Sequence, residues 1–186
     1  MKQEVQLKSG FVLLRPYTLN DANESYSAVR ESINELSPWM PWCHAEYSIE
    51  ESRKWIGERA DNWGKGLQYE FAITDSSSGL FLGGCGINNI SVTDRYANLG
   101  YWVRSTQTGR GISTMAASLL AKYGVKNLKL NRIEIIVAVG NKASQRVATK
   151  VGATREGILR NRIVVRDRIH DAVLFSIIPN DFNAHG

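Results

Sequence analysis

The stretch from Tyr101 to Gly124, YWVRSTQTGRGISTMAASLLAKYG, joins an apolar run to a helix-period segment through a short glycine-containing loop. Gly109 and Gly111 permit a tight turn and keep side chains away from a ligand. The first N–H groups of the following helix have no intrahelical partners, and they lie at the positive end of the helix dipole. This arrangement favours an anion site, most often for phosphate. A turn that holds no ligand would explain the same residues.

The side chains near this turn suit an anion. Ser113 and Thr114 supply hydroxyl donors, and Arg104 and Arg110 supply positive charge. The P-loop pattern GxxxxGK[ST] is absent, which argues against nucleoside triphosphate hydrolysis. The segment GRGIST is only half of a dinucleotide-binding GxGxxG motif, because Thr114 stands at the last glycine. The pyrophosphate of coenzyme A is a third ligand that such a turn could hold.

Three segments, in order along the chain, resemble the GNAT superfamily of N-acetyltransferases. The glycine loop looks like its acyl-CoA pattern Q/R-x-x-G-x-G/A, from which Thr108 and Ser113 depart. The segment NKASQRVATKVGATREG is similar to part of the ribosomal-protein N-terminal acetyltransferase branch (RimJ/RimL-like). The segments LSPWMPW and SIEESRKWI look like that branch's substrate loop and the helix after it.

The resemblance implies a site for acetyl-CoA as co-substrate, with no metal. Strand residues before the glycine loop would lie against the thioester, where a strand N–H could stabilise a developing oxyanion. Asn141 would bond the pantetheine arm, although a helix N-cap explains it as well. The cofactor-binding residues that it implies are Trp102, Val103, Arg104, Gly109, Arg110, Gly111, Ile112, Ser113, Thr114 and Asn141.

The catalytic groups are less constrained by the sequence. Ser144 is the candidate that protonates the departing thiolate, but a serine bonded within the first turn of a helix fits equally. Tyr123 or water would take that role if Ser144 does not. Glu70 is the candidate base, and partial burial would raise its pKa; an ordinary outward-facing Glu is the alternative. Trp39, Trp42 and His44 are expected to wall the acceptor site, or to pack their loop onto the sheet.

The periodicity predicts an α/β fold of the GNAT type, with a mostly antiparallel twisted sheet, flanking helices and a central β-α-β unit that binds acyl-CoA. A first strand covers 11–17, and Asn20 or Asp21 is expected to cap the first helix. Ser48 and Glu51 form a capping box for a second helix. Three strands follow as an antiparallel meander, with a turn at 75–79. The segment 132–139 reads as a strand buried on both faces, and a short helix over 142–151 ends at Gly152.

Composition and length narrow the range of possible functions further. The 186 residues are expected to form a single domain, with a net charge of +5 and only Cys43 and Cys85 as thiols. The start lacks an apolar signal segment, so a cytoplasmic location is expected. No nucleic-acid motif and no membrane-length apolar run appear. The arginines of LRNRIVVRDR could form a solvated hairpin face or a basic surface for an acidic partner.

The sequence therefore predicts an acetyl-CoA-dependent N-acetyltransferase whose acceptor is a primary amine, in particular the N-terminal α-amine of a protein such as a ribosomal protein. An α-amine has a pKa of about 7.7–8.0, against about 10.4 for lysine, so more of it is neutral near pH 7. Acetylation of a polyamine or an antibiotic is the alternative within the enzyme class. A CoA-binding or dinucleotide-binding module without transfer activity is the alternative outside it. A homodimer is common in the family.

Overall fold

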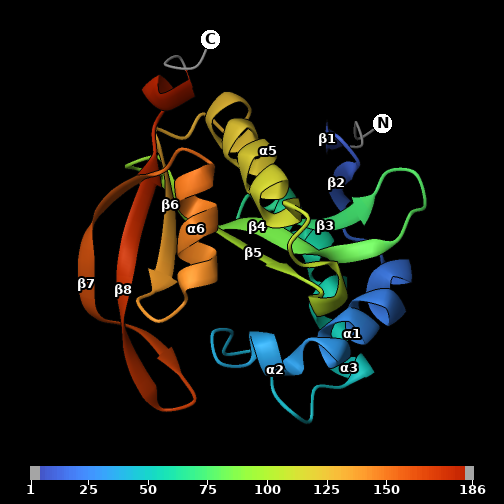
Figure 1. The fold of residues 1–186 in the computed structure, drawn as a ribbon. Coiled ribbons are helices and arrows are strands. Elements are labelled where there is room, and N and C mark those ends of the chain that lie inside the picture. The colour runs from blue at the N-terminus through green and yellow to red at the C-terminus, as the bar shows by residue number, and fades with distance from the viewer. Residues whose placement is uncertain (1–4, 183–186) are drawn as a thin grey trace.

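A computed structural model describes residues 5–182 of the chain. Its centre is an eight-stranded sheet in the order β1-β2-β3-β4-β5-β6-β8-β7 (Figure 1). Neighbouring strands are antiparallel except for β5 and β6, which run parallel because α5 crosses between them. The strands are β1 (Leu7–Ser9), β2 (Val12–Pro16), β3 (Tyr69–Asp75), β4 (Phe81–Ser91), β5 (Tyr96–Val103), β6 (Arg132–Ala138), β7 (Thr154–Val165) and β8 (Arg168–Ile177). The predicted mixed sheet and its central β-α-β unit are confirmed.

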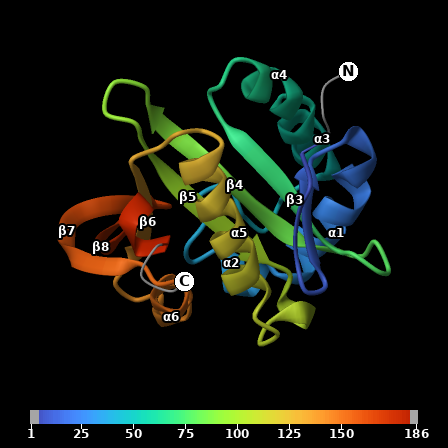
Figure 2. The same cartoon turned by 90° about the horizontal axis from the view of Figure 1, so that it is seen from above.

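Helices cover both faces of the sheet (Figures 1 and 2). The helices are α1 (Ala22–Glu31), α2 (Ile33–Leu36), α3 (Ile49–Gly57), α4 (Arg59–Gly64), α5 (Ile112–Lys126) and α6 (Lys142–Lys150). The apolar side of α5 packs on one face, where Ile112, Ala116 and Leu120 are buried against strand residues. On the opposite face Ala28 of α1 and Ile56 of α3 pack against Phe81. These two layers fix the positions of the glycine turn and the loop over 37–48 on either side of β5.

The sheet opens beside the glycine turn. Cα pairing between β5 and β6 covers only Tyr96 to Asn98 on β5, opposite Arg132 to Glu134 on β6. Beyond this point β5 remains paired with β4 as far as Val103. One edge of β5 therefore has no strand partner over its last residues, and β6 turns away toward α6, on the left of Figure 1.

Several local predictions are confirmed by the structure. Ser48 and Glu51 form the capping box of α3. The meander of β3, β4 and β5 is antiparallel. At the turn between β3 and β4 Asp75 accepts hydrogen bonds from the backbone N–H groups of Ser77 and Ser78. Gly152, with φ +85°, follows the end of α6 as expected.

Other local predictions were wrong in whole or in part. Asp21 does occupy the N-cap position of α1, but its side chain does not cap that helix: the chain enters α1 through a 3-10 turn, and Thr18 and Asp21 form the capping box of that turn. The first two predicted helices are each broken, into α1 and α2 and into α3 and α4. Strand β6 is fully buried on one face only, since burial alternates along it and Glu134 points to the less buried side.

Candidate active site

A groove of about 340 Å³ lies between the start of α5, the residues of α6 and the unpaired part of β5. The glycine turn forms one wall. Gly109 has φ +79° and Gly111 has φ +76°, and a Cβ on either would meet nothing within 4 Å. Both glycines therefore adopt the left-handed conformation and leave open space beside the backbone. The unpaired N–H groups at the start of α5 adjoin this space, with Ile112, Ser113 and Thr114 lining it.

The positive charge of the groove does not come from the arginines that the sequence suggested. The Arg104 guanidinium forms a two-point ion pair with Glu31 at 2.9 and 2.6 Å. The Arg110 guanidinium lies 4.7 Å from the centre of the Phe11 ring. Arg146 and Lys150, four residues apart on α6, line the groove instead. These two side chains supply the cationic wall opposite the glycine turn.

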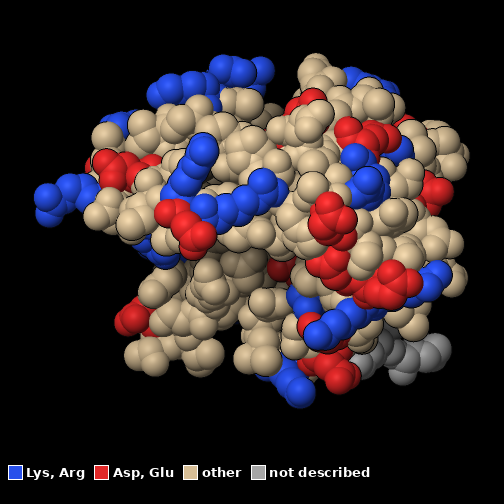
Figure 3. Space-filling view, turned by 90° about the horizontal axis from the view of Figure 1, so that it is seen from below, with Lys and Arg blue, Asp and Glu red and all other residues tan. Residues whose placement is uncertain are grey.

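A larger cavity of about 730 Å³ lies on the other side of β5. Figure 3, seen from below, shows the surface hollowed near its centre, with walls that carry few charged side chains. Its lining includes aromatic residues from the segment after β2, the 37–48 loop, α3 and β5: Tyr17, Trp39, Trp42, Tyr47, Trp55, Tyr101 and Trp102. Glu70, on β3, also lines this cavity. The arrangement suits a partly apolar ligand that carries an amine.

The groove and the cavity meet beside the unpaired edge of β5. Tyr101, Trp102, Asn141 and Ser144 line both spaces. The backbone N–H of Arg104 donates to Leu82 O at 2.9 Å, so it points toward β4. Because N–H directions alternate along an antiparallel strand, the N–H groups of Tyr101 and Val103 point to the opposite, unpaired edge. The N–H groups of Tyr101 and Val103 therefore face the groove, whereas the N–H of Arg104 is bonded to β4.

Comparison with known proteins identifies the family. Residues 12–154 match the family model described as "Acetyltransferase (GNAT) domain". The chain belongs to the GNAT acetyltransferase family. The sequence resemblance that the glycine loop carried is thereby confirmed.

This GNAT protein is similar to known proteins over most of its length. The Bacillus subtilis (strain 168) protein YdaF is 29% identical over 177 residues, which cover 91% of each chain. A ribosomal-protein-serine acetyltransferase of Escherichia coli (strain K12) is 24% identical over 159 residues, covering 86% of this chain and 88% of its own. The structure of Mycobacterium smegmatis RimJ in complex with a CoA-disulfide superposes with a TM-score of 0.84 at 27% identity, covering 96% of this chain and 88% of that one.

Glu70 faces the cavity of the GNAT protein rather than solvent. Glu70 on β3 pairs with Gly86 on β4, and Gly86 pairs with Gly100 on β5, so the next two residues across the sheet from Glu70 are glycines. A Cβ on Gly86 would overlap both carboxylate oxygens, so the carboxyl group lies flat over that glycine. The carboxyl group therefore lies over β4, the strand next to β5. Neighbouring strands are about 4.8 Å apart, so only one strand spacing separates it from β5.

Burial raises the pKa of the Glu70 carboxyl group, and a hydrogen bond from Asn88 and the charge of Arg59 oppose this shift. Asn88 Nδ2 lies 3.5 Å from Glu70 Oε1, at the long limit of a hydrogen bond. Asn98 in turn donates to Asn88 at 3.0 Å. A carboxylate with one weak partner, inside a cavity, is suited to take a proton from a ligand.

Ser144 lies at the start of α6, where Asn141 caps the helix by accepting from Ser144 N at 3.0 Å. The Ser144 Oγ atom lies 3.0 Å from the Tyr101 hydroxyl, which also donates to Ser144 O at 3.1 Å. Burial raises the pKa of Tyr101 to about 12, against a smaller opposing effect of the Ser144 hydrogen bond. The phenol is therefore protonated near neutral pH. Tyr123 packs against Phe71, with ring centres 5.6 Å apart, and lines neither space.

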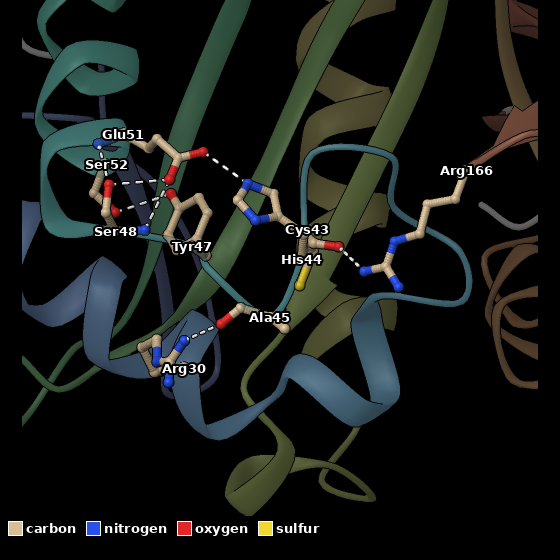
Figure 4. Close-up of polar contacts among 9 residues, drawn as sticks. All are labelled: Arg30, Cys43, His44, Ala45, Tyr47, Ser48, Glu51, Ser52 and Arg166. Carbon is tan, nitrogen blue, oxygen red and sulfur yellow. Dashed lines mark hydrogen bonds and ion pairs between the residues drawn. The ribbon is translucent and has the colours of Figure 1, made fainter.

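The loop over 37–48 places its aromatic residues beside the larger cavity. Trp39, Trp42 and His44 all line the cavity. Trp42 lies 5.8 Å from the Trp102 ring, centre to centre, and joins the loop to β5. His44 Nε2 lies 2.8 Å from Glu51 Oε1, which fixes the imidazole against the start of α3 (Figure 4).

Three features of the site were missed from the sequence. Tyr101 gave no signal apart from its place in an apolar strand. Asn88 and Asn98 are polar residues within otherwise apolar strand segments, a pattern that could have marked a polar site. Arg146 and Lys150 have the spacing of one helix face, which could have indicated a charged wall.

Among residues 5–182 no group of three or more His, Cys, Asp or Glu side chains is placed to hold a metal ion. No helix in the same range is long and apolar enough to cross a membrane.

Proposed function

We propose that this GNAT protein transfers an acetyl group from acetyl-CoA to the N-terminal α-amine of a protein, such as a ribosomal protein. The observation that carries the proposal is the junction at Tyr101, Trp102, Asn141 and Ser144. There an anion-binding groove and an aromatic cavity with a carboxylate open onto the same unpaired strand edge. A transferase needs such a junction, because donor and acceptor must meet in one place.

The groove fits coenzyme A by its own chemistry. The space beside Gly109 and Gly111 lets a phosphate approach the backbone N–H groups closely. Ser113 and Thr114 add hydroxyl donors at the same helix end. Arg146 and Lys150 on the facing helix complement phosphate charge. The complex of RimJ with a CoA-disulfide is consistent with this assignment.

Acetyl-CoA supplies the thioester carbonyl on which the acceptor amine acts. The residues of this chain would then have separate roles. The N–H groups of Tyr101 and Val103 are placed to donate to a carbonyl oxygen at the junction. Glu70 would accept the proton that the amine loses, directly or through one water molecule. Ser144 Oγ would donate a proton to the departing sulfur while it takes one from the Tyr101 hydroxyl, and solvent would then reprotonate the phenol.

Two observations favour an α-amine as the acceptor. An α-amine needs little help to lose its proton near neutral pH, which suits a single weakly partnered carboxylate better than lysine would. The Escherichia coli relative is named for a ribosomal-protein serine, so a protein acceptor is in keeping with the branch. A small amine remains the second candidate, because the aromatic cavity with Glu70 would also suit a small organic cation.

The test is a thiol-release assay with acetyl-CoA and four acceptors. These are a peptide with a free N-terminus, the same peptide with a blocked N-terminus, a peptide whose only amine is a lysine, and spermidine. Release with the first peptide alone supports the proposal. Faster release with spermidine favours the small-amine function. Binding of CoA without release for any acceptor would favour a binding module.

A further inference from the structure

The turn between β7 and β8 is built from residues that do not favour its conformation. Val165 pairs with Arg168, so Arg166 and Asp167 form a two-residue hairpin loop. Both have a left-handed backbone, with φ +46° and +63°. Such loops favour Asn-Gly, Asp-Gly or Gly-Gly, because most side chains other than those of Asn and Asp are strained there, so Arg166 is the unfavourable residue of the pair. Non-glycine residues in strained conformations often have a functional reason.

The side chain of Arg166 supplies a reason. Its Nη2 atom donates to the backbone oxygen of Cys43 at 2.7 Å, across 123 residues of sequence (Figure 4). The donor is a permanent cation and the acceptor is a carbonyl, so the hydrogen bond is charge-assisted. It connects the C-terminal hairpin with the loop over 37–48 that walls the acceptor cavity.

Cys43 lies between two residues of the loop that line the cavity. Its side chain is fully buried in a small cluster with Val29 and Leu36. Its two neighbours, Trp42 and His44, line the cavity. A shift of the Cys43 backbone would therefore move both cavity residues together.

Other contacts hold the loop from the N-terminal half of the chain. Arg30 of α1 donates to Ala45 O, and Glu51 of α3 bonds His44 (Figure 4). Arg166 holds it from the opposite side, and Ile163 of the same hairpin lines the cavity. Between them the hairpin tip and the loop bound the acceptor side of the molecule.

We infer that Arg166 is an acceptor-positioning residue, which fixes Trp42 and His44 by holding the Cys43 carbonyl and so sets the affinity for the acceptor. It acts through the loop and does not contact the reacting atoms. The kinetic part of this inference rests on the proposed acetyl transfer. The structural part, that Arg166 orders the loop, does not.

The test uses full-length variants chosen to keep the hairpin intact. Arg166→Gly removes the guanidinium at a position where glycine suits the backbone. Arg166→Gln keeps a polar side chain without the charge or the reach. Asp167→Gly is the control in the same loop, because it also places a glycine at a left-handed position and leaves Arg166 in place. Arg168→Gln controls for the loss of one positive charge.

Hydrogen exchange of the loop amides and steady-state kinetics with a free N-terminal peptide are measured on each variant. We expect faster exchange in 37–48 for both Arg166 variants, with β3 to β5 unchanged. We expect the peptide KM to rise about tenfold, the lower end of what hydrogen bonds to charged groups contribute. The acetyl-CoA Kd should stay at the parent value. The two controls should match the parent in all three measurements.

Loop exchange and peptide KM that match the parent in Arg166→Gly and Arg166→Gln would overturn the inference. An equal rise of peptide KM in Asp167→Gly would also overturn it, since hairpin strain would then be the cause. If the parent transfers no acetyl group to any peptide, the proposed function fails. In that case the exchange measurement alone decides whether Arg166 orders the loop.

Discussion

Replacing Gly86 by alanine should displace the carboxyl group of Glu70, the proposed base, without changing Glu70 itself. Gly86 lies directly beneath the Glu70 carboxyl group, and even the farther carboxylate oxygen would be 2.5 Å from the added Cβ. Ordinary van der Waals contact begins at 3.4 Å, so the carboxyl group must move. The adjoining cavity of about 730 Å³ offers room for it to turn, so the fold should persist. A positioned general base contributes about 10²–10⁴-fold. We expect kcat to fall about 10²-fold, because the carboxylate is displaced and not removed.

The assay is thiol release with saturating acetyl-CoA, together with the acetyl-CoA Kd and the melting temperature. Gly157→Ala is the control, because this strand glycine has nothing within 4 Å of an added Cβ. Glu70→Gln should lower kcat at least as much as Gly86→Ala. The double variant should be no worse than Glu70→Gln, since both changes remove one function. A folded Gly86→Ala protein with the kcat of the parent would contradict the role of Glu70 as the base. Losses of kcat that multiply in the double variant would contradict it as well.

Three further predictions concern the pH profile, the glycine turn and the acid. The plot of kcat/KM against pH should show two rising limbs, one for the peptide α-amine at about 7.7–8.0 and one for Glu70, whose pKa burial raises above the usual Glu range. Asn88→Leu should move only the Glu70 limb to higher pH, because the Asn88 hydrogen bond lowers that pKa. A profile in which neither limb moves would exclude Glu70. Gly111→Val should weaken CoA binding at least tenfold by calorimetry. Gly79→Val is the control, because Gly79 has the same φ of +76° and equally open space, and it should leave CoA binding unchanged. An equal loss of CoA affinity in both variants would place the pyrophosphate elsewhere. Ser144→Ala should lower kcat about 10²-fold and leave the CoA Kd unchanged. Adding Tyr101→Phe to this variant should lower kcat little further, because the two hydroxyls are bonded to each other. Losses of kcat that multiply in the double variant would show that the two hydroxyls do not act together.

The parts of the fold that were predictable are those with a local cause. The capping box at Ser48 and the Asp75 turn each depend on residues close together in sequence, and both were found as expected. The glycine turn and the amphipathic α5 were predictable for the same reason. The 3-10 turn at Thr18 was not predictable from local residues. Asp21 could cap a helix directly or close a capping box with Thr18, and in the structure it forms the capping box and also bonds Arg15.

The site was less predictable because it depends on pairings across the sheet. The sequence places Glu70 in a strand, but only the register shows that Gly86 and Gly100 lie beside it. Arg104 precedes the glycine turn and looks like a phosphate ligand, yet Glu31 from a distant helix binds it. Arg166 bonds a carbonyl 123 residues away. Long-range partners of this kind leave no local pattern in the sequence.

The central claim is most directly tested by locating the transferred acetyl group. The protein is incubated with acetyl-CoA and a peptide that carries both a free N-terminus and an internal lysine, and the product is fragmented in a mass spectrometer. The account predicts one acetyl group on the α-nitrogen, formed at a rate that falls sharply in Glu70→Gln. An acetyl group on the lysine side chain, or no acetylated peptide while CoA binds normally, would contradict it.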